Sequence, residues 1–211
     1  MFIQHKKHRT IVAETMQRLY NRGLTTTSGG NVSMRVNDLV FITPSQTDKG
    51  KIKHREIGIL TIDGKNRTPA LKPSMESEMH LEIYRKRPDI KSIVHAHPFT
   101  ASTLAAEESL IETDIAGEAR AVLGNPQFAP YCTMGTKELA EVVSNKALKS
   151  NVVIMQHHGV ITMGESMLQA FDRLEVLEMT ARTMVIRRIL NITQKISPEN
   201  IQIIDDMFGI K

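Results

Sequence analysis

Cysteine and aromatic side chains are scarce in this chain of 211 residues. The one cysteine, Cys132, cannot form a disulfide within the chain, which excludes a disulfide-stapled fold and a cysteine-rich metal knuckle. Tryptophan is missing and aromatic residues make up 4% of the sequence, so no basic stretch interleaved with aromatic side chains is present to bind nucleic acid. A single thiol also fits a reducing compartment, and we expect a cytoplasmic protein.

Long apolar runs and blocks of like charge are missing as well. No segment approaches the roughly 18 consecutive apolar residues that a transmembrane helix needs, and the polar first residues lack the apolar stretch of a signal peptide. Lysine and arginine number 27 against 23 acidic residues, a formal net charge of +4 without any run of like charges. We therefore expect neither a membrane nor a nucleic-acid partner, and the small positive excess suits an acidic or phosphorylated small molecule.

The composition that remains is that of a globular protein. Hydrophobic residues at 41% and charged residues at 24% lie in the range of folded domains. The length favours one domain, and no repeat, low-complexity segment or linker interrupts the chain. We predict a single domain over residues 1–211.

Hydrophobic periodicity predicts helices and strands along most of the chain, except for 107–134, which is expected to be mostly irregular. Turn signals at Asn37-Asp38 and Asp63-Gly64 indicate hairpins and argue against a purely parallel sheet. The predicted fold is therefore α/β, with a mixed, mainly antiparallel central sheet. Helices are expected over 5–22, 75–86, 99–106, 136–148, 165–190 and 198–207, and strands over 32–36, 39–42, 57–62, 93–97, 151–155 and 160–163.

His95 and His97 form the first candidate site for chemistry. They stand two residues apart at the end of an apolar predicted strand, so both imidazoles project from the same face and can meet one ion. Pro98 ends the strand there, which allows a site to open. By itself the pair is only moderately specific, because two histidines on a polar sheet face give the same pattern.

A second histidine pair, His157-His158, precedes Gly159 at a corner between two apolar predicted strands. Neighbouring strand residues face opposite ways, so we expect only one of the two to join a metal site. Three neutral imidazoles with one open position are the usual ligand set of a catalytic zinc ion. The alternative is that both side chains only fill and hydrogen-bond a tight turn.

Two loops have features of ligand-binding segments. Lys72-Pro73-Ser74-Met75-Glu76 enters a predicted helix, whose first backbone N–H groups attract anions such as phosphate. Glu76 in that turn equally suits simple stabilisation of the helix dipole. Gly29-Gly30-Asn31 permits close approach of the backbone to a ligand, but it matches neither a phosphate-binding lysine loop nor a dinucleotide motif.

The order of these motifs resembles the class II aldolase/adducin family over about residues 5–190. The motifs are Gly29-Gly30-Asn31 with Ser33, Thr43-Pro44-Ser45, Pro73-Ser74 with Glu76, His95-Ala96-His97-Pro98 and His157-His158-Gly159. The resemblance implies a three-layer α/β/α domain, assembled as a homotetramer with active sites between subunits. It is closest to the L-fuculose-1-phosphate aldolase branch, and the family also contains epimerases, dehydratases and decarboxylases.

Carried over by motif, the resemblance implies a Zn²⁺ cofactor and a set of site residues. Two positions depart from the family pattern, because Gln46 stands where the signature has glycine and Met75 where it has serine, which removes one phosphate-binding hydroxyl. The tyrosine that these aldolases bring from a neighbouring subunit has no clear match, and Glu118 is the substitute we predict. The implied metal ligands are His95, His97 and His158, with Glu76 as proton-transferring carboxylate and further metal contact; the implied substrate-binding residues are Gly30, Asn31, Ser45, Gln46, Ser74 and Met75.

The predicted activity is reversible cleavage of a ketose 1-phosphate into dihydroxyacetone phosphate and a short aldehyde. The alternatives are a methylthioribulose-1-phosphate dehydratase, another zinc lyase or an epimerase of the same family, and a non-catalytic binding domain like the adducin head. No lysine stands in a recognisable Schiff-base setting, which disfavours an imine mechanism. Cys132 has no evident base beside it and is expected to be a packed thiol.

Overall fold

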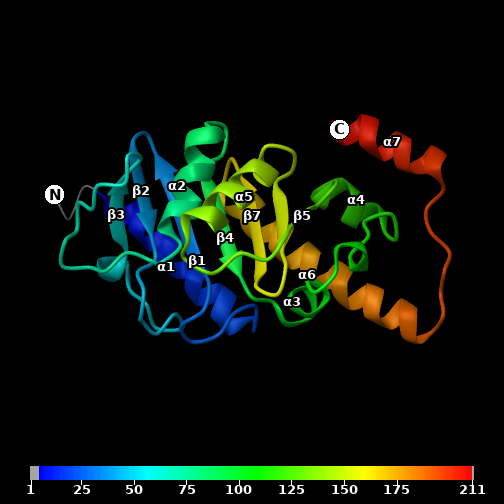
Figure 1. Cartoon of the computed structure of the whole chain (residues 1–211), viewed down its shortest axis with the longest axis horizontal. Coiled ribbons are helices and arrows are strands. Elements are labelled where there is room, and N and C mark those ends of the chain that lie inside the picture. The colour runs from blue at the N-terminus through cyan, green and yellow to red at the C-terminus, as the bar shows by residue number, and fades with distance from the viewer. Residues whose placement is uncertain (1–4, 211) are drawn as a thin grey trace.

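The computed structural model describes residues 5–210 and places a seven-stranded sheet at its centre (Figure 1). The strand order is β3-β2-β1-β4-β7-β6-β5, and every neighbouring pair is antiparallel except β5 with β6. The predicted mixed, mainly antiparallel sheet is confirmed. The strands are β1 (Asn31–Val36), β2 (Leu39–Ile42), β3 (Gly58–Thr61), β4 (Ser92–Ala96), β5 (Gln127–Ala129), β6 (Val152–Met155) and β7 (Gly159–Gly164).

Seven α-helices and two short 3-10 turns surround the sheet within the described range. None of these helices combines the length and the apolar character that crossing a membrane requires. The helices are α1 (Lys6–Asn21), α2 (Ser77–Lys86), α3 (Phe99–Leu104), α4 (Gly117–Leu123), α5 (Lys137–Ala147), α6 (Met167–Ile189) and α7 (Pro198–Phe208), and the 3-10 turns are His54–Glu56 and Glu108–Leu110.

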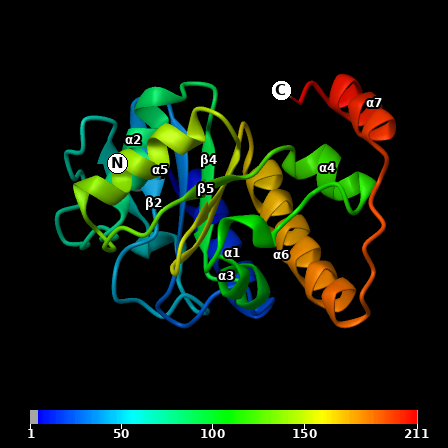
Figure 2. The same cartoon turned by 45° about the vertical axis from the view of Figure 1, so that its right-hand side comes forward.

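Alternating side chains on the strands build two separate apolar layers, one on each face of the sheet. On β4, Val94 and Ala96 pack with residues of α1 and α6, whereas Ile93 packs with α2 and α5 on the opposite face. Figure 2 shows α5 and α6 on opposite sides of the strands. The period of two along a strand thus produces the expected three-layer α/β/α arrangement, and it places His95 on the α2–α5 face, like Ile93.

The C-terminal helix α7 stands beside α4, at one end of the molecule (Figure 1). Its limits follow the sequence signals, because Ser197 accepts a hydrogen bond from the N–H of Asn200, Pro198 occupies the first turn, and Gly209 takes a left-handed conformation. Arg120 of α4 pairs with Asp205 of α7 at 2.5 Å, which fixes the two helices to each other.

The segment 107–134, which was expected to be mostly irregular, contains two short elements that the sequence did not predict. This segment contains α4 and the edge strand β5. Both are too short to show a clear period, and Gly117 opens the helix with a residue of low helix propensity. They form because of contacts made elsewhere: α4 packs against α6 and α7, and β5 pairs with β6.

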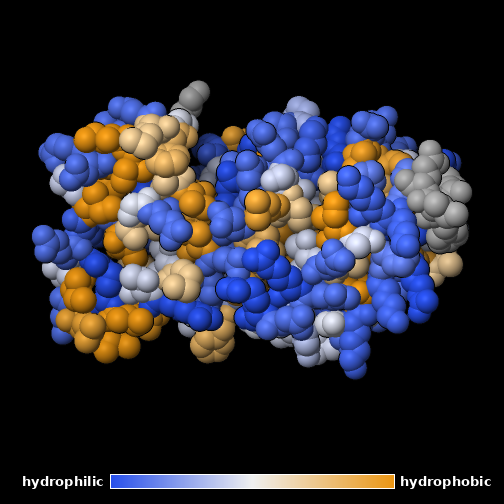
Figure 3. All heavy atoms as spheres, turned by 180° about the vertical axis from the view of Figure 1, so that it is seen from behind, coloured by the Kyte–Doolittle hydropathy of each residue, from blue (hydrophilic) through white to orange (hydrophobic). Residues whose placement is uncertain are grey.

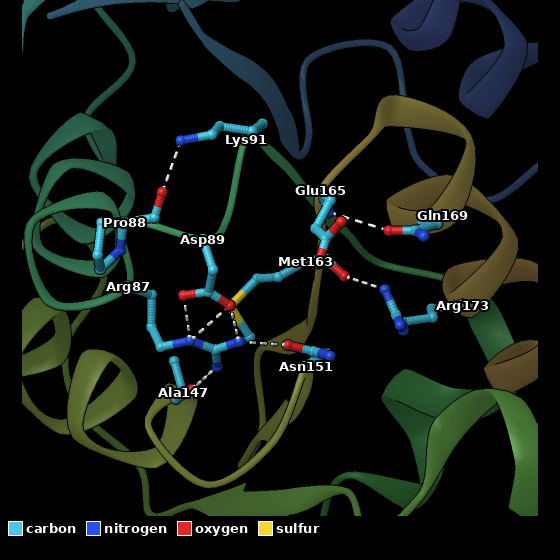
Figure 4. Close-up of polar contacts among 10 residues, drawn as sticks. All are labelled: Arg87, Pro88, Asp89, Lys91, Ala147, Asn151, Met163, Glu165, Gln169 and Arg173. Carbon is cyan, nitrogen blue, oxygen red and sulfur yellow. Dashed lines mark hydrogen bonds and ion pairs between the residues drawn. The ribbon is translucent and has the colours of Figure 1, made fainter. Parts of the chain in front are cut away.

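Hydrogen bonds of Arg87 connect the starts of β4 and β6 (Figure 4). This end of the strands is opposite the end of β4 that carries the histidines. The Nη1 of Arg87 donates to the carbonyl of Ala147 at 2.6 Å, and its Nη2 donates to Asn151 at 3.0 Å. The same guanidinium pairs with Asp89 at 2.6 Å. These bonds join the segment before β4 to the end of α5 and the start of β6.

Candidate metal centre and active site

Two imidazoles meet where β4 ends. His95 lies within β4 and His97 directly follows it, so the two side chains share one face of the sheet. Their Nε2 atoms are 3.1 Å apart. The spacing of the two histidines therefore brings them together, as predicted.

The third imidazole comes from the corner between β6 and β7. His157 has a φ of 53° and is exposed, whereas the ring of His158 turns inward, with its centroid 5.0 Å from that of His95. Only His158 joins the cluster, because successive side chains at this corner face opposite ways. One ring nitrogen from each of His95, His97 and His158 lies within 4.8 Å of the others.

A backbone contact orients the most deeply buried of the three rings. The Nδ1 of His95 lies 2.9 Å from the carbonyl oxygen of Val160 on β7, and a carbonyl can only accept a hydrogen bond. Nδ1 therefore donates to this carbonyl, and Nε2 is the ring nitrogen that faces the cluster. Metal-binding histidines commonly have this second contact, which fixes both the tautomer and the ring plane.

Glu76 faces the imidazoles from the N-terminus of α2. Its Oε2 accepts a hydrogen bond from Asn31 Nδ2 at 2.8 Å and lies 3.1 Å from His95 Nε2, while its Oε1 lies 3.2 Å from His158 Nε2. Burial raises the pKa of the Glu76 carboxyl, but its close contacts with the imidazoles of His95 and His158 outweigh burial and hold the pKa well below its usual range. The carboxylate is thus ionised at neutral pH.

The chemistry of this donor set fits a zinc ion. Burial lowers the pKa of His97 to about 3, assisted by the unfavourable interaction that a protonated His97 would have with the imidazoles of His95 and His158, so His97 is in the neutral form that binds metals. Glu76 Oε1 and both ring nitrogens of His158 are buried without a hydrogen-bond partner among the described residues. Such unsatisfied atoms call for an unseen partner, and three imidazoles with a carboxylate are a ligand set that zinc accepts.

Two glycines let the histidine segments approach one another. A Cβ on Gly159 would lie 2.5 Å from the His97 ring, and a Cβ on Gly30 would lie 2.6 Å from the carbonyl oxygen of His95. Gly30 also has a φ of 64°, which side chains disfavour. Both glycines are therefore required for the close packing of the cluster.

A cavity of about 270 Å³ opens beside the cluster, and the three loops that carry the predicted substrate-binding residues line it. The loops at residues 43–46 and 72–76 are joined, because the N–H of Met75 donates to Ser45 Oγ at 3.2 Å and the N–H of Ser45 donates to the carbonyl of Lys72 at 3.1 Å. The structure thus brings together the residues predicted to bind substrate: Gly30, Asn31, Ser45, Gln46, Ser74 and Met75 all line this cavity, with Glu76, His97 and His158.

Comparison with known proteins decides the family. The family model described as the Class II Aldolase and Adducin N-terminal domain matches residues 10–185.

The chain belongs to the class II aldolase and adducin family. An L-fuculose phosphate aldolase of Methanococcus vannielii is 36% identical over 164 residues, which are 78% of this chain and 88% of that protein. A 3-oxo-tetronate 4-phosphate decarboxylase of Haemophilus influenzae is 31% identical over 177 residues, 82% of this chain and 84% of that protein. A solved L-fuculose 1-phosphate aldolase is 29% identical, with a TM-score of 0.86 over 96% of both chains.

Gln46 occupies the position where the family resemblance predicts a glycine. The φ of Gln46 is 58°, in the left-handed region that glycine adopts without strain. The loop therefore keeps the backbone conformation of a glycine-containing turn although the residue has changed.

Sequence reasoning missed a buried, charged residue of the cavity wall. Lys49 is 1% exposed and lines the cavity, and burial lowers its pKa to about 8. Its neighbours Asp48 and Gly50 suggest an ordinary surface turn, so no local signal reveals the burial.

The remaining predicted side chains lie outside the cavity. Glu118 is exposed in the first turn of α4 and is not among the cavity residues of this subunit, so its catalytic role stays a prediction that requires a neighbouring subunit. Cys132 is buried in the layer beneath α5, and burial raises the pKa of its thiol. It packs as predicted.

Proposed function

We propose that the protein is a zinc-dependent aldolase that reversibly cleaves a ketose 1-phosphate, of the L-fuculose 1-phosphate type, to dihydroxyacetone phosphate and a short aldehyde. The observation that supports the proposal is the convergence of three imidazoles and an ionised Glu76 beside a cavity lined by two loops that are predicted to bind an anion. We assign His95, His97 and His158 as metal ligands, with Glu76 as an additional contact in the resting state.

Cleavage of the carbon–carbon bond leaves its electron pair on the carbon next to the carbonyl, as an enediolate. A bound zinc ion would act as a Lewis acid that stabilises this negative charge. In the condensation direction, Glu76 would take the proton from that carbon, and in cleavage it would return the proton there. The hydroxyl proton lost by the departing aldehyde needs a second base, and we assign that role to Glu118 of a neighbouring subunit.

The substrate phosphate would lie against the loops at residues 43–46 and 73–76. Ser45 and Ser74 offer hydroxyls, and Gly30, Gln46 and Met75 offer backbone atoms at the cavity wall. Asn31 donates to Glu76 and leaves its own Oδ1 without a partner among the described residues, so it would position the carboxylate and accept a substrate hydroxyl.

We propose a homotetramer with active sites between subunits. Exposed apolar side chains gather over α6 and α7 (Figure 3), and among them are Ile186, Ile189, Ile203, Met207 and Phe208. A patch of this kind on a folded protein is typical of a surface that another subunit covers. The protein should elute well above 23.7 kDa, and an active monomer would contradict this proposal.

Product analysis on a small panel of ketose 1-phosphates, with and without a chelator, tests the activity. The panel contains fuculose, ribulose, 5-deoxyribulose and methylthioribulose esters. Chelator-sensitive release of dihydroxyacetone phosphate supports the aldolase, and the best ester identifies the aldehyde. A dehydrated product without triose phosphate would instead indicate a dehydratase.

A decarboxylase is the second candidate, because a relative with that name is 31% identical over most of the chain. Release of carbon dioxide from a 3-oxo acid phosphate, without any aldehyde product, distinguishes it from the aldolase. No turnover on any ester or acid would favour the non-catalytic binding domain.

A further inference from the structure

Lys49 places a buried positive charge in the wall of the active-site cavity. Its side chain is 1% exposed, and its Nζ donates to the carbonyl oxygen of Pro44 at 2.7 Å. Its own backbone N–H donates to Thr27 at 2.8 Å, which holds this segment against the glycine loop. Within the described residues 5–210, no carboxylate forms an ion pair with this ammonium group.

A buried ammonium without a counter-ion is unfavourable, and proteins normally pair such a charge or coordinate it. The ionisable groups that share the cavity with Lys49 do not supply one. Lys72 is a second cation, His97 and His158 belong to the proposed metal ligands, and Glu76 already faces Asn31 and two histidines. The cavity therefore contains a cation whose negative partner is missing from the described chain.

We propose that Lys49 is the charged anchor for the anionic end of the substrate, a phosphate dianion bound between residues 43–46 and 73–76. The inference deepens the proposed function, on which it rests for the nature of the ligand. Pro44 precedes Ser45 in one of these loops, so the bond from Lys49 to the Pro44 carbonyl keeps the ammonium against the loop. An ammonium donates three hydrogen bonds, and one is used here.

The anchor compensates for the hydroxyl that the change to Met75 removes. Met75 brings no hydroxyl to the site, and its side chain is 66% exposed. A buried ammonium forms charge-assisted hydrogen bonds, which are about twice as strong as those between neutral groups. One such contact can replace the lost serine contact, and it selects a doubly charged end group over a neutral hydroxyl.

The competing role for a lysine of this kind is nucleophilic. In an imine mechanism the neutral amine would attack the substrate carbonyl and lose water, and borohydride would then trap the adduct on Lys49. Anchoring requires the protonated ammonium and forms no covalent bond. A borohydride-dependent mass increase on Lys49 in the presence of a ketose phosphate would therefore overturn the proposal.

The decisive experiment measures binding of inorganic phosphate to the metal-loaded protein by titration calorimetry, without any turnover. Lys49→Met removes the charge at similar side-chain length, and we expect phosphate to bind about tenfold to hundredfold more weakly. Lys51→Met is the matched control, because this lysine is two residues away but its side chain is 86% exposed. The control should change affinity by less than about twofold. Equal affinity of wild type and Lys49→Met, or no phosphate binding by the wild type, would overturn the anchor.

A second readout separates an anchor from a purely structural lysine. Because burial lowers the pKa of Lys49 to about 8, the amine is largely neutral at about pH 9, and a bound dianion must draw a proton onto it. Calorimetry in two buffers of different ionisation enthalpy should show proton uptake by the wild type that is missing in Lys49→Met. If that variant does not fold, Lys49→Gln keeps a hydrogen-bond donor without the charge and serves the same comparison. Uptake that persists unchanged in the folded variant would refute the anchor.

The outcome is independent of the catalytic assignment. If phosphate binding depends on Lys49 but no ester is cleaved, the anchor stands and the aldolase proposal fails. If an ester is cleaved with the same KM by wild type and Lys49→Met, the aldolase stands and the anchor fails.

Discussion

The two ends of strands β4, β6 and β7 differ in whether their polar groups have hydrogen-bond partners within the described chain. At one end Arg87 is bonded to Asp89, Ala147 and Asn151, so a half-buried guanidinium is enclosed by acceptors from its own chain (Figure 4). At the other end, Glu76 Oε1, Asn31 Oδ1 and the ring nitrogens of His158 have no hydrogen-bond partner among the described residues, and Lys49 has no acid beside it.

This difference distinguishes polar groups that stabilise the fold from polar groups that bind a ligand. A buried polar atom without a partner costs free energy, and a ligand that bonds to the atoms clustered at the histidine end would remove that cost. We therefore expect substitutions at the histidine end to change binding and activity more than stability. Substitutions at the arginine end should do the reverse.

The largest effect is expected from His95→Ala. This variant removes the central imidazole, and the two that remain bind zinc poorly. Activity should fall by at least about 10³-fold together with the bound metal. Metal analysis of the purified variant beside a turnover assay checks this, and full retention of the metal would remove His95 from the ligand set.

Glu76→Gln should lose turnover while keeping the metal. The amide preserves the shape of the side chain but cannot move a proton, and general acid–base groups typically contribute about 10²- to 10⁴-fold. A rate close to that of the wild type at full metal content would contradict the role proposed for Glu76.

Arg87→Met tests the opposite end of the sheet. It leaves the Ala147 carbonyl and Asn151 without their donor, and we expect the free energy of unfolding to fall by about 2–4 kcal/mol. Activity per folded molecule should stay unchanged. Arg85→Met is the control, since its pairs with Glu78 and Glu82 lie at the surface and should contribute less than about 1 kcal/mol.

Lys49→Met should stabilise the protein, in contrast to Arg87→Met. The substitution removes a buried charge without a partner, which stabilises the folded chain, and it also removes the hydrogen bond to Pro44, which destabilises it. The net result should be a rise in the free energy of unfolding of about 1–3 kcal/mol at neutral pH. Denaturant unfolding monitored in parallel with wild type provides the measurement. A clear loss of stability would show that Lys49 is mainly structural.

The pH dependence of stability gives the same test without a substitution. The pKa of Lys49 is about 8 in the folded chain against 10.5 for an ordinary lysine, so between these values the unfolded chain binds more protons. The free energy of unfolding should therefore rise with pH between these two pKa values. Below about pH 8 the folded chain keeps the charged lysine, so the whole free-energy cost of burying the charge remains. The rise should be missing in Lys49→Met when both proteins are unfolded in denaturant across this range.

Local patterns were enough to predict much of this molecule. The period of two placed His95 and His97 on one face, the corner before Gly159 allowed one inward histidine, and Ser197-Pro198 began the last helix. These features depend on a few consecutive residues and on backbone geometry, which a sequence shows directly.

Tertiary packing decided the rest. The helix α4 and strand β5 form because of α6, α7 and β6, and their own residues carry too weak a signal to be recognised. The sequence around Lys49 is typical of a polar surface turn. In the folded chain, however, Lys49 bonds to Thr27 and Pro44, and its side chain is buried in the cavity wall. Burial and the pKa shift that follows from it depend on residues that are distant in the sequence, and only the folded chain brings these together.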